Sequence, residues 1–387
     1  MKIIVTGLIA QYPFGGVIWD YIQYVLGFQA LGHEVWYLED TGTWAYDQVA
    51  QTYTEDCTQN IESLQRLMNL FGLTNRWIYR NGANGQFFGL PEAQARDLLK
   101  NCDLVANVSG AALLEDYDLG NAHLMFLDGD PMFTQLAMIN EAKPEAGNRV
   151  ERHHSHFSFG LNLGQPDCLV PTLGINWKQT VQPISLDHWP VAKNPPRYGY
   201  TTVMNWASYA PKEWNGQMYG QKDLEFQRFI DLPQKCSHSF ALAMGQGPGR
   251  QRPTEKLQQL GWTIYEPDQF VPDHLTYHRF LSDSRAEWSI AKHGYVQSKS
   301  GWFSCRTACY LAAGRPAVVQ ETGWSRTIPS GQGVFAFNTM EECLEQIARL
   351  ESDYDGHQRA ARRLAEEHFS AYKVCSKLIS DAGIGQC

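Results

Sequence analysis

The N-terminal third of the chain alternates short apolar runs with amphipathic stretches. Residues 3–5 are continuously apolar, which is typical of a strand buried on both faces of a parallel sheet. After a glycine-containing loop, apolar residues recur at helical spacing from Val17 to Leu26, and Gly32 supplies a helix stop. A second apolar run follows at 35–38. Further elements are predicted at 61–71 (helix), 104–108 and 123–127 (strands). The pattern predicts a doubly wound α/β domain.

The same alternation begins again after a stretch with little periodicity. Residues 181–199 contain prolines at 183, 190, 195 and 196, and we place a domain junction near 194–197. Beyond it, strands are predicted at 200–206, 240–244, 288–291 and 317–319, and helices at 305–313, 340–350 and 357–379. Thr339 and Glu342 form a capping box before the helix at 340–350. The sequence therefore predicts two similar α/β halves.

Composition narrows the class of protein and its partners. The 387 residues are 43% apolar and 19% charged, which excludes a disordered or coiled-coil chain. With 32 Lys plus Arg against 41 Asp plus Glu the net charge is −9, so nucleic acid is not an expected partner. The nine cysteines include no C-x-x-C pair, which indicates a reduced, cytoplasmic protein. No apolar window is long enough to span a membrane, so we expect at most peripheral membrane contact.

Two segments at predicted helix starts are candidate anion sites. Gly15 and Gly16 let the backbone approach a ligand at the start of the first helix, where free amides are available. Residues 298–306 lead into the helix at 305–313 in the same way, and Arg306 in its first turn opposes the helix dipole unless an anion binds beside it. The candidates in this second segment are Ser300, Gly301, Trp302, Phe303, Ser304 and Arg306. The rings of Trp302 and Phe303 would each provide a face for a base or a sugar. The alternatives are a tight turn without a ligand and a capped core helix with buried aromatic rings.

Three further features of the second half are candidate ligand contacts. Arg250 ends the glycine-rich run 245–250 after the strand at 240–244, and is a candidate phosphate contact. Lys222 is an isolated cation that is suited to a phosphate. Thr322 and Gly323 follow the strand at 317–319, at the sheet edge where open α/β sheets bind ligands. Solvated side chains are the alternative for Lys222 and Arg250.

Carboxylates and histidines supply candidate acid–base groups. Asp128 and Asp130 follow the apolar run at 123–127, a position suited to proton transfer or to binding a hydroxyl group. His156 is a third candidate, and it lies close to His153 and His154. The H-H-x-H spacing of this group matches no rigid metal-binding pattern, so we predict no metal site and interpret the histidines mainly as polar loop residues.

Taken together, these segments make the chain similar to glycosyltransferases of the GT-B fold, a large group of nucleotide-sugar-dependent enzymes. The most specific resemblance runs from Trp302 to Phe337 (WFSCRTACYLAAGRPAVVQETGW, then IPSGQGVFAF), which is similar to their donor-binding segment. Gly15-Gly16 and residues 31–35 also match the N-terminal domain of these enzymes. The final helix resembles the one that returns to that domain.

The resemblance implies two Rossmann-like domains that face each other across a cleft. An acceptor would bind the N-terminal domain (1–194), a nucleotide-diphosphate sugar would bind the C-terminal domain (195–360), and 361–387 would return to the first domain. No metal or other cofactor is implied, because cations and helix amides stabilise the leaving diphosphate. The implied roles are diphosphate binding for Arg306, Ser300, Ser304, Lys222 and, more weakly, Arg250; contact with the donor sugar for Thr322 and Gly323; and orientation or deprotonation of the acceptor hydroxyl for Asp128, Asp130 or His156.

One position departs from the resemblance. Many of these enzymes carry a ribose-binding glutamate five residues before the glycine that corresponds to Gly314, and here that position is Cys309. The usual pair of glutamates separated by seven residues is also absent. Ribose recognition must then differ, and Glu321 is a possible substitute.

Other functions remain open from the sequence. Tyr295 and Lys299 reproduce the Tyr-x-x-x-Lys dyad of short-chain dehydrogenases, but Ala10 and Pro13 stand where the glycine fingerprint requires glycine, so hydride chemistry is disfavoured. A nucleotide-sugar epimerase of the same fold is a second alternative. A non-catalytic nucleotide- or sugar-binding protein is a third, and Cys309 is the residue that favours it.

Overall fold

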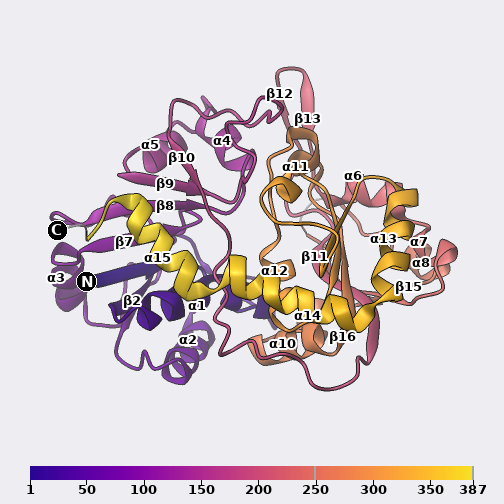
Figure 1. The fold of residues 1–387 in the computed structure, drawn as a ribbon. Helices are drawn as coiled ribbons and strands as arrows, with labels where there is room; N and C mark the ends of the chain where they lie inside the picture. The colour runs from indigo at the N-terminus through magenta and orange to yellow at the C-terminus, as the bar shows by residue number, and fades with distance from the viewer. Residues whose placement is uncertain (248–249, 386–387) are drawn as a thin grey trace.

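The computed structural model describes residues 1–247 and 250–385 and contains two parallel sheets, each covered by helices (Figure 1). The first sheet has the strand order β10-β9-β8-β7-β1-β2-β5-β6, and its only antiparallel pair is β5 with β6. Its strands are β1 (Lys2–Thr6), β2 (Glu34–Glu39), β5 (Trp77–Arg80), β6 (Phe87–Gly89), β7 (Leu104–Val108), β8 (His123–Asp128), β9 (Ser155–Ser158) and β10 (Trp177–Gln179). The central strands are buried on both faces, as their continuous apolar runs predict.

The second sheet has the order β15-β14-β11-β16-β17-β18 and is parallel throughout. Its strands are β11 (Tyr198–Asn205), β14 (Phe240–Gly245), β15 (Trp262–Tyr265), β16 (Ser284–Ser289), β17 (Ala317–Gln320) and β18 (Val334–Phe337). Two small hairpins stand apart from the sheets, β3 (Ala45–Asp47) with β4 (Thr52–Thr54) and β12 (Lys212–Trp214) with β13 (Gln217–Tyr219). The GT-B type of fold that the sequence predicts is thus confirmed at the level of both sheets.

Helices connect the strands within each half. In the first half these are α1 (Gly15–Ala30), α2 (Thr58–Leu70), α3 (Glu92–Lys100), α4 (Phe133–Met138) and α5 (Glu145–Glu151). In the second half they are α6 (Lys222–Phe226), α7 (Leu232–Lys235), α8 (Thr254–Gln259), α9 (Pro267–Phe270), α10 (His274–Ser282), α11 (His293–Ser298), α12 (Cys305–Ala312), α13 (Met340–Ser352) and α14 (Tyr354–Leu364). No helix among the described residues has both the length and the apolar run needed to cross a bilayer.

The end of the chain crosses from the second half to the first (Figure 1). α14 packs against α12, a π-helical turn follows at Ala365–Phe369, and α15 (Ala371–Ala382) packs against α1. The sequence predicts one helix over 357–379, whereas the extended backbone of Ser370 (φ −49°, ψ 122°) ends the turn and starts a new helix. At this break Ile184, in the segment that joins the two sheets, accepts a hydrogen bond from the Ala371 amide at 2.8 Å. The segment that joins the two sheets is therefore in contact with the C-terminal segment that returns to the first half.

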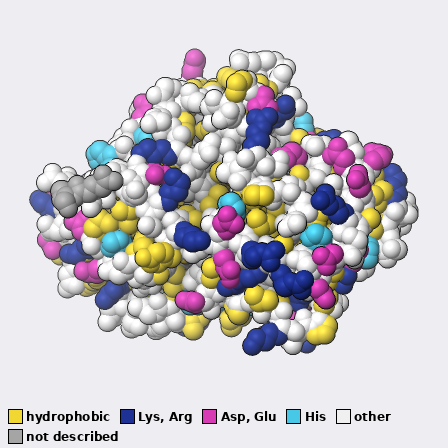
Figure 2. Space-filling model, viewed as in Figure 1, with side chains coloured by type: hydrophobic (Ala, Val, Ile, Leu, Met, Phe, Trp, Pro, Cys, Tyr) yellow, Lys and Arg dark blue, Asp and Glu magenta, His cyan; other side chains and the backbone are white. Residues whose placement is uncertain are grey.

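The predicted capping box at α13 is half formed. The Thr339 hydroxyl accepts a hydrogen bond from the Glu342 amide at 3.2 Å, but the Glu342 carboxylate accepts from the Asn338 amide instead of the Thr339 amide. Surface charge is mixed, with Lys and Arg interspersed among Asp and Glu on the face shown in Figure 2. This distribution suits the net charge of −9 and offers no large cationic stripe on that face.

Candidate functional site

Two adjoining cavities lie between the two sheets, at the carboxyl ends of their strands. The N-terminal cavity, about 490 Å³, is lined by residues at the ends of β7 and β8 and by one side of α1. The C-terminal cavity, about 430 Å³, is lined by the ends of β11 and β14 and by the first residues of α1, α6 and α12. Five residues line both cavities: Asp20, Gly129, Lys292, Tyr295 and Cys305. In open α/β sheets this edge is where ligands bind, because loops and helix N-termini converge there.

The C-terminal cavity is bordered by cations. Lys222, the first residue of α6, has no hydrogen bond or ion pair with any described residue. Burial, together with the nearby positive charges of Arg306 and Lys292, holds the pKa of the Lys222 ammonium well below its ordinary value. A partly buried ammonium without a counterion is unfavourable, so the cavity is suited to an anion.

Arg306 lines the same cavity but is already partnered. Its Nε donates to the Glu287 carboxylate at 2.7 Å, and its other nitrogens donate to Ser289 Oγ at 2.6 Å and to the Val203 carbonyl. Glu287 is fully buried and the Arg306 side chain is 10% exposed. Arg306 therefore ties α12 to β11 and β16, and this pairing, which the sequence does not predict, gives it a structural role at the wall of the cavity.

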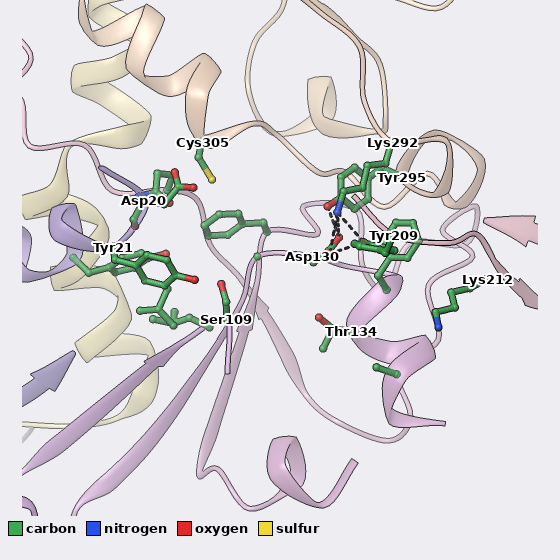
Figure 3. Close-up of a pocket in the computed structure, with 18 residues that line it drawn as sticks. Asp20, Tyr21, Ser109, Asp130, Thr134, Tyr209, Lys212, Lys292, Tyr295 and Cys305 are labelled. Atoms are coloured by element: carbon green, nitrogen blue, oxygen red, sulfur yellow. Dashed lines mark hydrogen bonds and ion pairs between the residues drawn. The ribbon is translucent and has the colours of Figure 1, made fainter. Parts of the chain in front are cut away.

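A cluster of four side chains joins the two halves across the cleft (Figure 3). Asp130, after β8, accepts hydrogen bonds from Lys292 at 3.0 Å, from the Tyr209 hydroxyl at 2.7 Å and from the Tyr295 hydroxyl. Lys292 also donates to the Tyr209 hydroxyl at 2.8 Å. We call these four residues the interdomain clasp. Burial and the neighbouring Asp130 carboxylate hold the pKa of Tyr295 well above its ordinary value, so the phenol stays a donor.

Asp20 on α1 is a second carboxylate at the boundary between the cavities. It borders both of them, with Tyr21 beside it on α1 and Cys305 across from it (Figure 3). Burial raises the pKa of Asp20 to about 7, and the Arg306 charge and the Cys305 thiol offset only part of that rise.

The predicted donor-binding residues divide into two groups. Those that line the C-terminal cavity are Gly15, Gly16, Lys222, Trp302, Ser304 and Arg306. Arg250, Ser300, Gly301, Phe303, Thr322 and Gly323 lie outside both cavity linings. Arg250 pairs with Asp223, and its neighbours Pro248 and Gly249 in the glycine-rich run lie outside the described residues.

The residues outside the cavities hold loops together. The Ser300 carbonyl accepts from the Asn162 amide at 3.1 Å, and a Cβ on Gly301 (φ +80°) would lie 2.2 Å from the same amide nitrogen. Phe303 stacks on Phe369, and the Thr322 hydroxyl donates to the Trp302 carbonyl at 2.7 Å. These contacts bring the loop at 300–304 against the first half of the chain, so its backbone is used in packing.

Gly15 and Gly16 lie at a close interdomain contact. A Cβ on Gly15 would lie 2.3 Å from the Asp273 carbonyl oxygen, while one on Gly16 would meet only the Tyr277 ring, at 3.3 Å. Earlier in the same loop, the Ala10 amide donates to the buried Glu39 carboxylate at 2.8 Å. The loop that precedes α1 therefore packs against other elements at Ala10 and Gly15, and it borders the C-terminal cavity at Gly15 and Gly16.

The predicted acid–base residues are separated by the fold. Asp130 lines the N-terminal cavity, but Asp128 and His156 are absent from both described linings. The buried Asp128 carboxylate accepts from the Thr134 hydroxyl at 2.6 Å and from the Ser158 hydroxyl at 2.8 Å, and burial raises its pKa. His156 lies on β9, not in a loop, and its Nε2 is 2.8 Å from the Val150 carbonyl oxygen. Among the described residues no group of His, Cys, Asp and Glu is arranged to hold a metal ion.

The structure also bears on three other hypotheses from the sequence, which concern the Tyr295–Lys299 dyad, Cys309 and Glu321. Tyr295 faces Asp130 whereas Lys299 approaches Asp167 at 3.4 Å, so the two do not form a dyad. Cys309 is 2% exposed and its Sγ lies 3.8 Å from Gln23 Nε2, beneath α1 and outside the linings of both cavities. Glu321 accepts hydrogen bonds from the amides of its own loop, including that of Thr322 at 2.9 Å, so its carboxylate shapes a turn.

Three residues of the site are not predicted from the sequence. Lys292 follows β16 and faces the cleft, a placement that its position after a predicted strand end could have indicated. Tyr209 comes from the loop before β12, and only the fold shows its contact with Asp130. Asp20 is a single carboxylate within an apolar helix, which by itself gives no sign of function.

With two parallel-sheet halves and a cleft at their strand ends, the chain has the GT-B fold of glycosyltransferases. An α-glucosyltransferase in complex with UDP-glucose and DNA containing an abasic site matches with TM-score 0.60 and 12% identity, covering 99% of both chains. A glycosyltransferase from Rickettsia africae matches with TM-score 0.55 and 14% identity over 98% of this chain and 97% of that one.

A third structure extends the comparison. Sucrose-phosphate synthase from Thermosynechococcus elongatus matches with TM-score 0.54 and 11% identity over 98% of both chains. No protein-family model matches the chain, and no curated protein sequence matches it. At these identities the comparisons show a shared fold, and the chemistry has to be argued from the cavities.

Proposed function

We propose that this protein is a glycosyltransferase that moves a sugar from a nucleotide-diphosphate donor to an acceptor hydroxyl. The donor binds in the C-terminal cavity and the acceptor in the N-terminal cavity. The fold supports this arrangement, as do the two cavities that adjoin at the strand ends of opposite sheets. The division of roles follows the expected domains, 1–194 for the acceptor and 195–360 for the donor, with 361–387 as the returning segment.

The observation that carries the proposal is the Lys222 ammonium. It is partly buried at the cavity wall, lacks a partner among the described residues and lies near two other cations. An anion with several oxygens, such as a diphosphate, would satisfy its three N–H donors and relieve the repulsion from Arg306 and Lys292. A neutral sugar alone would leave that repulsion in place.

Departure of the diphosphate is then assisted by the protein itself. Lys222 supplies a positive charge, and the amides after Ser304 at the start of α12 supply oriented donors. Trp302, whose indole donates to the Gly129 carbonyl at 3.1 Å, borders the place where the sugar would lie. We propose that this set works without a metal ion, so turnover should survive treatment with EDTA.

The N-terminal cavity suits an acceptor with an apolar or ring-shaped body. Its rings come from α1, α4, the clasp and the residue after β9, and include Tyr21, Tyr24, Phe133 and Phe159. Such rings pack against the faces of sugars and other cyclic molecules. Asp130, the predicted acid–base residue that lies here, would hold the cleft closed around the substrates through the clasp.

The test is a melting-temperature screen with UDP, GDP, ADP and dTDP, followed by incubation with the matching nucleotide sugars. A diphosphate at about 100 times its Kd should stabilise the protein by about 2.7 kcal/mol. The matching donor should then be slowly hydrolysed, releasing the diphosphate. If no diphosphate stabilises the protein and no donor is consumed, the proposal is wrong. Binding without any turnover would instead favour a non-catalytic protein, and bound NAD(H) a reductase.

A further inference from the structure

Helix α1 of the first half packs directly on helix α10 of the second half. Trp19 on α1 donates its indole N–H to the His274 carbonyl at 2.9 Å. Gly15, at the start of α1, lies so close to α10 that a Cβ would be 2.3 Å from the Asp273 carbonyl oxygen. The same stretch of α1 lines the C-terminal cavity through Gly15 and both cavities through Asp20. A change in the packing of α10 against α1 therefore changes a wall of the cleft.

Three histidines lie in this contact among aromatic rings. His274 and His278 are one helical turn apart on α10, and His188 comes from the segment that joins the two sheets. The centroid of the Trp19 ring lies 6.1 Å from that of His274 and 6.3 Å from that of His278. The His188 ring lies 6.5 Å from the Trp19 ring, and the His278 ring lies 4.4 Å from that of Trp189. We call these five residues the histidine contact.

The two imidazoles on α10 lack the partners that charged imidazoles need. Nε2 of His274 and Nε2 of His278 are buried and have no hydrogen-bond partner among the described residues. A neutral imidazole can leave one ring nitrogen as an unprotonated acceptor, whereas an imidazolium carries two N–H donors that both need acceptors. His188 differs, because its Nδ1 lies 2.8 Å from Ser185 Oγ. Protonation of His274 or His278 in the packed contact would therefore bury a donor without an acceptor.

The surroundings of the three rings do not compensate for a positive charge. Among the described residues, none of the three histidines forms an ion pair with a carboxylate. The Asp273 carboxylate accepts hydrogen bonds from the first amides of α10, and Asp283 approaches Arg197 at 3.6 Å. The charged and titratable groups around α10 and His188 are Asp187 from the joining segment, Asp273 and Asp283 from the ends of α10, Arg66 from α2, Arg362 from α14, and Arg306 and Cys309 from α12, which face Tyr277. From α1 and the end of α2, the rings meet only the uncharged Trp19 and Phe71.

Titration of the histidines opposes the contact at acid pH. Burial lowers the pKa of His188, His274 and His278, and the nearby carboxylates offset only part of that change. If the helices separate, the rings meet water and regain the ordinary imidazole pKa of about 6.5. Between the lowered and the ordinary value, opening takes up protons, so a falling pH favours the open arrangement. The contact is therefore fully stable above about pH 7, and below about pH 6.5 the opening equilibrium rises by up to about tenfold per pH unit for each histidine.

We propose that the packing of α10 on α1 is an acid-sensitive contact that controls the width of the cleft. Proton uptake by His274 and His278 separates the two helices, and the halves move apart because α1 belongs to one and α10 to the other. Acid then weakens whatever the two cavities bind, since α1 lines both of them. This inference goes beyond the proposed function and does not depend on it, because the proton is the only ligand involved.

The experiment compares the wild-type protein with the double variant His274→Phe/His278→Phe by small-angle scattering without added ligand. Phenylalanine keeps a flat ring against Trp19 and takes up no proton. The wild-type radius of gyration should increase between about pH 7.5 and about pH 5.5, and that of the double variant should change by less than half as much. Burial raises the pKa of Asp20 to about 7, so Asp20 titrates in both proteins and the difference between them reports on the histidines. His33→Phe, before β2 and outside the linings of both cavities, is the matched control and should respond to acid as wild type does.

Amide hydrogen exchange of the wild-type protein gives a second measurement, which also serves if the double variant does not fold. After correction for the intrinsic effect of pH, exchange in α10 and in the first turns of α1 should be about tenfold faster at the lower pH. Exchange in α3 and α13, which lie outside this contact, should not change.

Two results would overturn the proposal. In the first, the wild-type radius of gyration and the exchange of α10 are the same at both pH values, as expected if the faces of Trp19 and Trp189 hold an imidazolium in place. In the second, the double variant responds to acid as strongly as the wild-type protein, which assigns the response to other groups. Failure to bind any diphosphate or to consume any donor removes the transferase proposal and leaves this one standing, because neither measurement uses a ligand.

Discussion

Replacing Lys222 with methionine should change donor binding and the stability of the unliganded protein in opposite directions. Methionine keeps much of the apolar stem and removes the ammonium. In the proposed complex Lys222 donates to the diphosphate, and a hydrogen bond to a charged group contributes about 1.5–3 kcal/mol. The Kd for the nucleoside diphosphate should therefore rise by about 10- to 100-fold. Isothermal titration calorimetry at pH 7 measures this change.

The unliganded protein should gain stability from the same change. The pKa of Lys222 is lowered in the folded protein, so the unfolded chain binds more protons than the folded one in the pH range between the two values. Wild-type stability therefore rises with pH across that range, and below it the protein bears the full cost of charging a buried group. Lys222→Met lacks this cost, so at pH 7 we expect a gain of about 1 kcal/mol, or about 1 °C in Tm for a chain of 387 residues. The gain should shrink as the pH rises toward 10.

The pH dependence of binding has a matching sign. A bound diphosphate favours the charged ammonium, so binding takes up a proton wherever Lys222 is neutral in the free protein. Affinity should fall as the pH rises, and the heat of binding should depend on the ionisation enthalpy of the buffer. Lys256→Met, on the exposed surface of α8, should change neither affinity nor stability. If Lys222→Met lowers the Tm and leaves the Kd unchanged, Lys222 does not bind the donor's diphosphate.

Three other variants test the packing around the cleft. Arg306→Met should lower stability by about 3–5 kcal/mol, because it leaves the fully buried Glu287 unpaired, and adding Glu287→Gln should restore part of the melting temperature. Asp130→Asn removes the carboxylate that accepts the hydrogen bonds of the clasp. We expect the free energy of unfolding to fall by about 1–2 kcal/mol and the radius of gyration, measured by small-angle scattering, to increase. Unchanged scattering would show that the clasp does not hold the halves together. Gly15→Ala should lower the Tm more than Gly16→Ala, because only the former places a Cβ within 2.3 Å of backbone on α10; equal effects by calorimetry would contradict this account.

The elements that the sequence predicts well are the buried parallel strands. The apolar run at 104–108 coincides with β7, and the runs at 3–5 and 240–244 lie within β1 and β14. Strands such as β9, with the sequence Ser-His-Phe-Ser, carry too little apolar pattern, so His156 was interpreted as a loop residue. A parallel neighbour on either side makes β9 a strand. Pairing of this kind depends on the neighbouring strands of the sheet, so the local sequence does not predict it.

The site was harder to predict because it is made by contacts across the cleft. Small and polar residues at 300–304 are typical of a ligand loop, and the same composition suits a loop that packs closely against another domain. In the structure Gly301 serves the second purpose, since its position lies against the Asn162 amide. Lys222 could be recognised only as an isolated cation, and its lack of a partner appears once α6 is placed beside Arg306.

Cys309 shows how the fold changes the meaning of a departure in the sequence. From the sequence alone, a cysteine in place of a ribose-binding glutamate weakens the case for a donor site. In the structure this position is 2% exposed and lies beneath α1, next to Gln23, whose side-chain oxygen accepts from the Ser185 amide at 3.0 Å. A glutamate here would bring a further carboxylate close to Asp20 and Glu287 at the junction of the two halves, and a small thiol allows α1 and α12 to approach. The cysteine at this position therefore goes with close packing of α1 against α12. In the proposed donor complex the ribose would be recognised by residues that line the C-terminal cavity, among which Asp268 and Asn205 offer polar groups.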